Sequence, residues 1–384
     1  WGKAAIEISK DADARIILTG TPAPYGYEDL YNLIKFIYPY KFQEIMRIHH
    51  NQLRELTKSG LTVQDNKVNN FVENIKPFFI RINKKELNLP DPKEQTVKVS
   101  MDSLHRKIYD SVFDTYRPQL EANPKATVAD VINKAKILRL RQAATNPTLL
   151  LKPFVETLEL SKDGDGFDQN SIYQNLNMEF DDSDLIEDIM LYKETNIPEK
   201  FVAIKDIYEK KILPFGGKVI VWTIFIQNAF EFQKYLLNFG IESKLLIGSV
   251  EQGEREEIIK KFNNPNNNDF NIVIANPFTV SESISLHKGC QNAIYMERDY
   301  NAANFIQSKN RIHRVGMPDG LTANYYYLIS EVSIDETIDD RLSERVIRME
   351  EIIDQEIRLF DRVNNDDEDY TDIITGLLDS YYAK

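Results

Sequence analysis

The sequence predicts an α/β protein whose second half is a parallel β-sheet covered by helices. From Lys200 onward, short apolar runs alternate with helical stretches of about 10–15 residues, which is the pattern of a parallel sheet with helices on both faces. The chain has 384 residues, of which 42% are hydrophobic and 28% are charged. At roughly 100–200 residues per domain, this length and composition predict two or three ordinary globular domains.

The alternation places each element of the second half. The strands are expected at 219–224, 244–247, 271–275, 293–296 and 324–329. The helices are expected near 227–238, 252–262, 302–313 and 335–352. The sequence contains no internal repeat, so these elements are predicted to form one α/β domain of about 150 residues.

The beginning of the chain is predicted to be one strand followed by helices. An apolar run at 15–18 ends in Thr19-Gly-Thr-Pro22, as expected for a strand that stops at glycine and proline. The next helix is ended by Pro39 and has apolar residues at helical spacing: Leu30, Leu33, Ile34 and Ile37. Residues 43–75 have the pattern of polar helix.

The middle of the chain combines a strand, two helices and an acidic segment. Polar and apolar residues alternate over 94–100, which predicts a half-buried strand. Asp102 is expected to cap the helix that follows, and a further helix starts at Thr127. Residues 156–195 are acidic and Asn/Asp-rich and are expected to be a linker or flexible insertion. Within them, residues 162–188 hold nine carboxylates and one lysine, which suits either a solvated insertion or an autoinhibitory mimic of DNA.

The charge of the chain disfavours a general nucleic-acid coat protein. There are 47 basic and 60 acidic residues, for a net charge of -13. Residues 76–107 are different, because this segment contains eight basic and four acidic residues. Phosphate contacts are local and are screened beyond about 10 Å, so the net charge does not exclude a DNA-binding face.

Cysteine, histidine and hydropathy patterns argue against a structural metal, a disulfide framework and a membrane span. The only cysteine is Cys290, and no two of the five histidines have an i, i+4 spacing. The longest apolar stretch, 219–226, is far short of the about 20 residues that a span needs. No signal peptide is visible, which predicts a cytoplasmic location.

Eight short blocks take the inference further, in this order along the chain: Arg15–Pro22, Ile75–Arg81, Leu138–Gln142, Lys218–Phe225, Ile247–Gly248, Ser281–Leu286, Asp299–Asn301 and Gln307–Gly316. They resemble motif III, the crossing segment, the helix before lobe two, motif IV, the block after it, motif V, the Trp-Asn-Pro block and motif VI of the Swi/Snf class of superfamily-two ATPases. The resemblance covers most of the chain and follows the family's order.

The blocks also depart from the family's pattern. Motif V has serines where the family has glycines, and Pro277 stands where a threonine is usual. Met317 replaces the glutamine after motif VI, and Ile82 replaces an arginine of the crossing segment. These departures indicate a divergent branch similar to bacterial or phage proteins.

The family's phosphate-binding loop, Gly-x-x-x-x-Gly-Lys-Ser/Thr, does not occur in this sequence. Gly217-Lys218 is followed by Val219 instead of the Mg²⁺-binding hydroxyl. Asp366–Asp369 is expected to lie in a polar tail, not at the end of a buried strand. The resemblance therefore implies that ATP and Mg²⁺ are bound mainly by an N-terminal ATPase lobe, and that this chain is the C-terminal portion of the motor.

The resemblance implies five regions. They are the end of a RecA-like lobe one (1–45), helical protrusions with the crossing segment (46–155), an acidic insertion (156–198), a RecA-like lobe two (199–350) and a C-terminal brace helix with a tail (351–384).

Motif VI carries the implied catalytic residues. Arg311 and Arg314 lie three apart, are expected on one helical face, and would act as arginine fingers on ATP, together with Gln307 and Gly316. His313 is expected to be packed or solvated, and not a general base.

The other blocks carry implied DNA and coupling residues. Contacts to the DNA backbone are implied for Lys84, Lys85, Thr223, Gly248, Arg255, Ser281, Ser283 and Ser285. Coupling between the ATP and DNA sites is implied for Thr19, Gly20, Thr21 and Pro22. Simpler structural roles remain open for these residues: a strand-to-turn exit at 19–22, a buried strand hydroxyl at Thr223, turn and helix-surface residues at Gly248 and Arg255, and a half-exposed loop at the serines.

The resemblance implies an ATP-dependent double-stranded-DNA translocase that works with its N-terminal lobe and with other subunits of a defence or repair system. One alternative is a non-catalytic DNA-binding or protein-interaction module that kept the fold. Another is a glycosyltransferase lobe, which explains the α/β alternation but not Gln307–Gly316.

Overall fold

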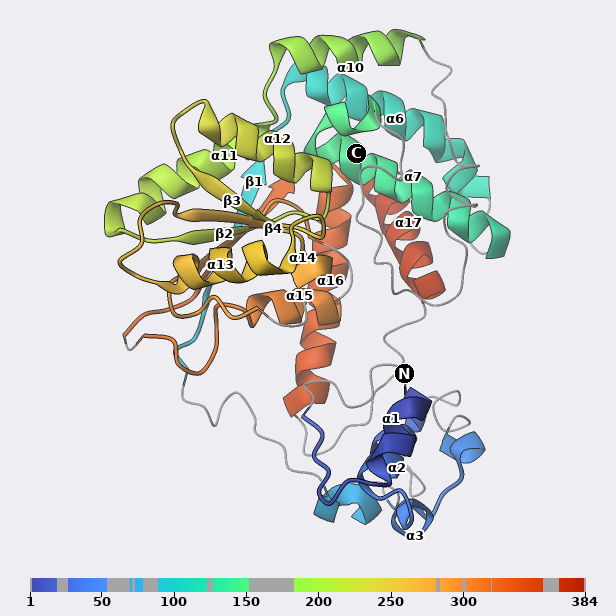
Figure 1. Cartoon of the computed structure of the whole chain (residues 1–384). Helices are drawn as coiled ribbons and strands as arrows, with labels where there is room; N and C mark the ends of the chain where they lie inside the picture. Colours follow the sequence, from blue (N-terminus) through green and yellow to red (C-terminus); the bar gives the residue numbers. More distant parts are fainter. Residues whose placement is uncertain are drawn as a thin grey trace. The chain divides into compact units, whose positions relative to one another are not determined.

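The computed structural model describes residues 2–18, 27–53, 70, 73–78, 89–122, 127–151, 183–280, 284–298, 302–318, 320–354 and 366–382. The chain divides into two compact units (Figure 1). The first unit comprises residues 1–88 and 345–366, and the second comprises residues 89–344 and 367–384. No helix among the described residues is both long enough and apolar enough to cross a membrane.

The first unit is built of short helices: α1 (Gly2–Ser9), α2 (Tyr27–Ile37), α3 (Phe42–Met46) and η1 (Lys76–Phe78). The helix expected before Pro39 is confirmed as α2, and it buries Leu30 and Ile34. Met46 and Leu53 are buried completely. The part of the expected polar helix that lies in 54–69 is outside the described residues.

The strand expected at 15–18 is wrong. These residues have no regular secondary structure, and Ile16 and Leu18 are 80% and 92% exposed. A strand is stabilised by pairing with a neighbour, and none of the described residues of the first unit forms a strand that could pair with this run.

The second unit contains a six-stranded sheet in which all pairs are parallel, with the order β1-β6-β5-β2-β4-β3. The strands are β1 (Lys93–Val99), β2 (Val219–Trp222), β3 (Ser243–Leu246), β4 (Ile272–Ala275), β5 (Asn292–Tyr295) and β6 (Asn324–Ser330). The predicted parallel sheet is therefore confirmed, with strand ends that differ from the expected ones by one or two residues.

β1 joins this sheet, although it lies far from the other strands in the sequence. It pairs with β6 from Lys93 opposite Asn324 to Val99 opposite Ser330. The strand expected at 94–100 is confirmed. Its place was not predicted, because the segment was assigned with the helical protrusions, whereas β1 extends the sheet of the α/β domain.

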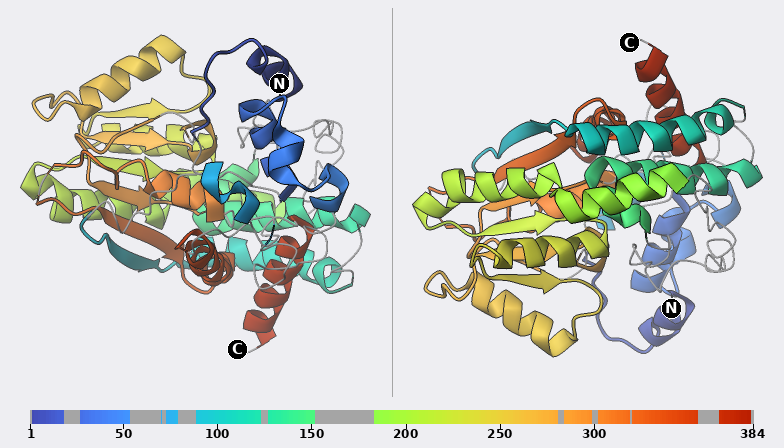
Figure 2. Two further views of the ribbon diagram at one scale, coloured as in Figure 1. Left: turned by 90° about the horizontal axis from the view of Figure 1, so that it is seen from below. Right: turned by 90° about the horizontal axis from the view of Figure 1, so that it is seen from above.

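Helices cover both faces of the sheet (Figures 1 and 2). They are α11 (Glu199–Ile207), η4 (Tyr208–Ile212), η5 (Leu213–Phe215), α12 (Ile226–Leu237), α13 (Gln252–Asn263), α14 (Pro277–Val280), α15 (Ala302–Lys309) and α16 (Ile334–Asp354). Side chains alternate between the two faces along the paired strands β2 and β5. Val221 packs with α11 and α12, whereas Tyr295, opposite the next residue Trp222, contacts Phe305 of α15 at a ring distance of 5.2 Å. Trp222, at the end of β2, lies in the core and is 1% exposed.

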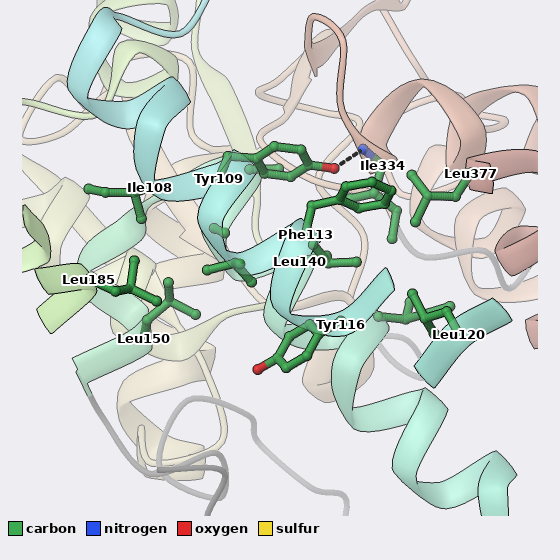
Figure 3. Close-up of a cluster of buried hydrophobic side chains, with 14 of the residues drawn as sticks. Ile108, Tyr109, Phe113, Tyr116, Leu120, Leu140, Leu150, Leu185, Ile334 and Leu377 are labelled. Carbon is green, nitrogen blue, oxygen red and sulfur yellow. Dashed lines mark hydrogen bonds between the residues drawn. The ribbon is translucent and has the colours of Figure 1, made fainter. Parts of the chain in front are cut away.

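A helical cluster packs beside the sheet within the second unit (Figure 1), and Figure 3 shows its buried side chains. It contains α6 (Ser103–Ala122), α7 (Thr127–Thr145), η3 (Pro147–Leu151), α10 (Ser183–Thr195) and α17 (Asp366–Tyr382). Asp102 caps α6 as expected, since its Oδ1 accepts the backbone N–H groups of Leu104 and His105, both at 2.8 Å. The Tyr109 hydroxyl accepts the N–H of Ile334 at 2.8 Å, which ties α6 to the start of α16.

Part of the expected linker is a packed helix. Residues 183–195 form α10, which buries Leu185, Ile189 and Tyr192. This spacing of four and three is one helical face, but the acidic residues around it hid the pattern in the sequence. Residues 152–182 of the acidic segment lie outside the described residues.

Asp366–Asp369 do not end a strand, as expected, but they belong to a helix and not to an irregular tail. These residues begin α17, which buries Ile373, Ile374 and Leu377. A Cβ added at Gly376 would lie 3.0 Å from Thr337 Cγ2, so α17 packs closely against α16.

Candidate functional site

Arg311 and Arg314, the two arginines of the implied ATP site, lie in turns and not on a helix. α15 ends at Lys309, and residues 310–316 form turns and bends. The expectation that Arg311 and Arg314 share one helical face is therefore wrong. Tertiary contacts hold this segment instead, including one from the His313 Nε2, which lies 2.9 Å from the carbonyl oxygen of Pro90.

Arg311 is half-buried and anchors the turn to the segment 284–286. Its Nη1 donates to the carbonyl oxygen of Ile284 at 3.2 Å, and its own carbonyl oxygen accepts the N–H of Leu286 at 3.0 Å. Its Nε is buried without a hydrogen-bond partner. Burial lowers the pKa of Arg311, and the nearby charge of Arg314 lowers it further. This guanidinium therefore serves the fold as well as contributing charge.

Arg314 is exposed and donates from Nη1 to the hydroxyl of Ser285. Among the described residues no carboxylate pairs with it. The motif VI arginine thus sits on motif V's Ser285 with its charge accessible. A guanidinium in this situation can fork onto phosphate oxygens.

Gly316 closes the turn with a φ of +90°, which favours glycine. A Cβ at this position would also lie 3.1 Å from His287 Nε2. Gln307 is half-buried on α15, beside Ser308, whose hydroxyl lies 2.7 Å from that of Tyr295. The structure therefore brings Ser285, Arg311, Arg314 and Gly316 together, with Gln307 on the preceding helix.

Thr223 needs a correction, because its side chain is completely buried. Its hydroxyl donates to the carbonyl oxygen of Phe225 at 3.3 Å. A direct contact of Thr223 with DNA is not compatible with this position, and the alternative of a buried hydroxyl at the end of β2 is supported.

A buried charge network that the sequence did not predict lies at the carboxyl ends of the strands. Lys200 is 1% exposed, and its Nζ donates to Asp335 Oδ2 at 2.6 Å and to the carbonyl oxygen of Met296 at 2.9 Å. Glu297, two residues after the end of β5, accepts the N–H of Ile224 at 3.1 Å and the amide of Asn228 at 2.7 Å. Burial raises the pKa of Glu297, and the charge of Lys200 opposes this. The one signal for this network in the sequence was Glu297, a glutamate that directly follows the strand expected at 293–296.

This network extends to the helical cluster. The Asn146 amide donates to Asn228 Oδ1 at 2.9 Å and to Glu231 Oε2 at 2.7 Å. Asn146 follows α7, so the segment that resembled the helix before lobe two is hydrogen-bonded to the helix after β2.

Gly248 and Arg255 are placed around the turn after β3. Gly248 is exposed. Arg255 donates to the carbonyl oxygens of Val250 at 3.0 Å and Ile247 at 3.3 Å, so it stabilises the turn. The remaining sequence-predicted residues, Thr19, Gly20, Thr21, Pro22, Lys84, Lys85, Ser281 and Ser283, lie outside the described residues.

The described residues contain no group of three or more side chains of the kind that hold a metal ion. The cluster around Arg314 offers positive charge and hydroxyl donors. These groups fit the phosphate oxygens of ATP, but they do not fit Mg²⁺, which prefers carboxylate oxygens and water.

The chain is similar in sequence to known helicase-related proteins. Residues 3–152 match the SNF2-related domain, and residues 199–316 match the helicase conserved C-terminal domain. The chain is 20% identical over 338 residues to chromodomain-helicase-DNA-binding protein 1 of Gallus gallus, covering 87% of this chain and 17% of that protein. It is 24% identical over 370 residues to the ATP-dependent helicase FUN30 of Saccharomyces cerevisiae, covering 85% and 32%. Among solved structures, the Sulfolobus solfataricus SWI2/SNF2 ATPase core in complex with dsDNA has a TM-score of 0.47 and 19% identity, covering 85% of this chain and 59% of that one.

The parallel sheet and the motif VI turn define an α/β lobe of the RecA-like type found in helicase-like ATPases. The chain belongs to the Swi/Snf-type, superfamily-two helicase-like ATPases. It spans only about a sixth to a third of the length of these two curated relatives. Its assignment to a bacterial or phage-like branch stays a prediction.

Proposed function

We propose that this chain is the C-terminal part of an ATP-dependent double-stranded-DNA translocase. In this proposal, lobe two supplies arginine fingers to ATP and contacts to the DNA backbone. The proposal rests most directly on Arg314, an exposed guanidinium without an ion pair among the described residues, held on Ser285 by a turn that Arg311 anchors.

The chemistry of phosphoryl transfer explains why this arrangement matters. Negative charge on the transferred phosphoryl group must be stabilised in the transition state, mainly by positioned positive charge. Arg314 is accessible for this role, whereas Arg311 is half-buried and orients the turn. Gln307 and Gly316 would complete the contact with ATP.

The phosphate cradle and the Mg²⁺ carboxylates are expected on an N-terminal ATPase lobe of the same protein. The sequence of this chain has no Gly-x-x-x-x-Gly-Lys-Ser/Thr loop. When ATP and Mg²⁺ are bound by that lobe, the metal neutralises charge on the phosphates, and lobe two adds its arginine at the γ-phosphate.

DNA contacts are proposed for Ser285, Gly248 and the lysines Lys84 and Lys85, and also for Ser281 and Ser283, which precede Ser285 in the sequence. Hydroxyls, exposed backbone N–H groups and lysines are the usual donors to phosphate oxygens, and they carry no base preference. Arg255 would act by holding the Gly248 turn. Thr19–Pro22 would couple the ATP and DNA sites.

The test is Arg314→Ala in a protein that contains this chain together with its ATP-binding lobe. DNA-stimulated ATP hydrolysis should fall by about 10³-fold or more, because arginine fingers contribute about 10³–10⁵ in rate. The affinity for ATP should stay within a few-fold, since the charge acts mainly in the transition state. Arg314→Lys should restore little, because an ammonium cannot fork onto two oxygens.

A matched control is Lys288→Ala, which removes an exposed cation near the same turn. Its turnover should stay near that of the wild type. If folded Arg314→Ala protein also kept near-normal turnover, motif VI would be structural here, and the alternative of a non-catalytic module that retains the fold would be preferred.

A further inference from the structure

We propose that His287 is a positioning residue that holds Arg314 in place while its imidazole is uncharged and releases it when the ring is protonated. The inference rests on the proposed function, because it makes the presentation of the arginine finger depend on pH. His287 lies in the loop directly after Leu286, in the segment to which Arg311 and Arg314 are bonded.

Packing places the ring under the turn. His287 is 8% exposed, and its Nε2 and Cδ2 would lie 3.1 and 3.7 Å from a Cβ at Gly316. Gly316 has a φ of +90°, and the N–H of Met317 donates to the carbonyl oxygen of Arg314 at 3.1 Å. The turn from Arg314 to Met317 therefore packs against the imidazole of His287. A larger residue at position 316 would push the turn and the imidazole apart.

The surroundings of the ring disfavour a charge on it. Nδ1 is buried without a hydrogen-bond partner. The charged groups that act on the ring are Arg314, from the turn, and Lys288, from its own loop, and both are cations. Among the described residues no carboxylate forms an ion pair with it.

The pKa of His287 is accordingly lowered, first by burial and then by Arg314 and Lys288. A histidine whose pKa is lower in the folded than in the unfolded state stabilises the fold above its unfolded pKa. This contribution is lost as the pH falls through the folded pKa. Here the protonated ring would stand beside Arg314 as a like charge, so acid should displace the arginine from Ser285 before it unfolds the domain.

The first experiment uses the chain as it is and needs no ATP hydrolysis. The C2–H proton of His287 is followed by NMR against pH and is assigned by its absence in His287→Gln. Arg314→Ala should shift the midpoint of this titration upward, because it removes a repelling cation. Lys210→Ala, which removes an exposed cation of the second unit that is not among the charges acting on His287, should leave the midpoint unchanged.

The second experiment measures DNA-stimulated ATP turnover between pH 5.5 and 8.0 in protein that also contains the ATP-binding lobe. Wild-type turnover should fall by about twofold or more from pH 7.5 to 5.5, as expected when an uncharged histidine is required. His287→Gln should keep a larger share of its activity at pH 5.5, with an unchanged KM for ATP at pH 7.5. Thermal melting of both proteins at both pH values controls for unfolding.

The outcomes separate this inference from the proposed function. If Arg314→Ala leaves turnover intact, the arginine-finger function itself fails. If Arg314→Ala abolishes turnover but the NMR midpoint does not move, or His287→Gln loses activity in acid as the wild type does, the positioning role of His287 is overturned and the proposed function stands.

Discussion

Charged residues in the second unit have two different roles, which their burial distinguishes. Arg314 is exposed and is held by one hydroxyl, so its charge is available to a ligand. Lys200 and Glu297 are buried beneath the ends of β2 and β5, where they bond to backbone groups and to Asp335 and Asn228. Charges of the second kind are costly to bury and are tolerated only when they are fully paired.

We therefore expect Lys200→Met to destabilise the protein strongly. The change leaves Glu297, which is buried, and Asp335, whose side chain is 10% exposed, without their cation, and breaking a buried pair in this way costs about 3–5 kcal/mol. The free energy of unfolding from urea denaturation measures it. Lys210→Met is the matched control: Lys210 pairs with Asp206 in a surface ion pair, its side chain is 70% exposed, and its loss should change little.

At the scale of elements, α10 is a packed helix, although the amino-acid composition of its segment is that of a linker. Asp and Glu residues flank its buried face, so the acidic segment resembled a linker although Leu185, Ile189 and Tyr192 share one face. The opposite happened at 15–18, where an apolar run without a neighbouring strand among the described residues of its unit remains exposed. An element's stability depends on what covers it.

Ile189→Ala should lower the free energy of unfolding by about 2–4 kcal/mol, because Ile189 is 1% exposed in the helical cluster and truncation leaves a cavity. Met190→Ala, at a neighbouring position that is 43% exposed, should cost much less. Chemical denaturation measures the free energy of unfolding of both variants. Equal and small effects would mean that 183–195 behaves as the linker that its composition indicated.

At the scale of the whole molecule, the proposed activity requires a phosphate-binding loop, which is expected on another lobe of the protein. No phosphate-binding loop occurs in this sequence, and the chain spans only part of the length of its relatives. The net charge of -13 also means that any contact with DNA must use local basic or hydrogen-bonding groups.

The chain alone should therefore not hydrolyse ATP at a meaningful rate. An assay of phosphate release with duplex DNA should give a rate near the background. Turnover of about 1–100 per second, typical of phosphoryl-transfer enzymes such as kinases, would contradict the proposal that the ATP cradle lies on another lobe.

The chain should bind duplex DNA weakly, without base preference and with a strong salt dependence. Counterion release predicts that affinity falls by about tenfold or more between 50 and 200 mM salt when several phosphates are contacted. Fluorescence anisotropy with two unrelated duplexes measures this.

Lys84→Ala/Lys85→Ala should weaken binding and reduce the salt slope. Lys193→Ala/Lys234→Ala, which changes two exposed lysines on α10 and α12, is the control. Strong preference for one sequence, or no response to salt, would exclude a translocase-type contact.

The sequence by itself determined the elements of the α/β domain. Short apolar runs such as Val219–Trp222 alternate with helical stretches in the sequence, and this local pattern predicted the strands and helices. The order of the motifs indicated that Gln307–Gly316 is a functional segment. Only the tertiary structure decided that β1 pairs with β6, that Thr223 is buried, and that Arg311 lies in a turn, where it donates to the carbonyl oxygen of Ile284. Periodicity is a property of neighbouring residues, whereas these three outcomes depend on contacts between residues far apart in the chain, whose free energies no local pattern contains.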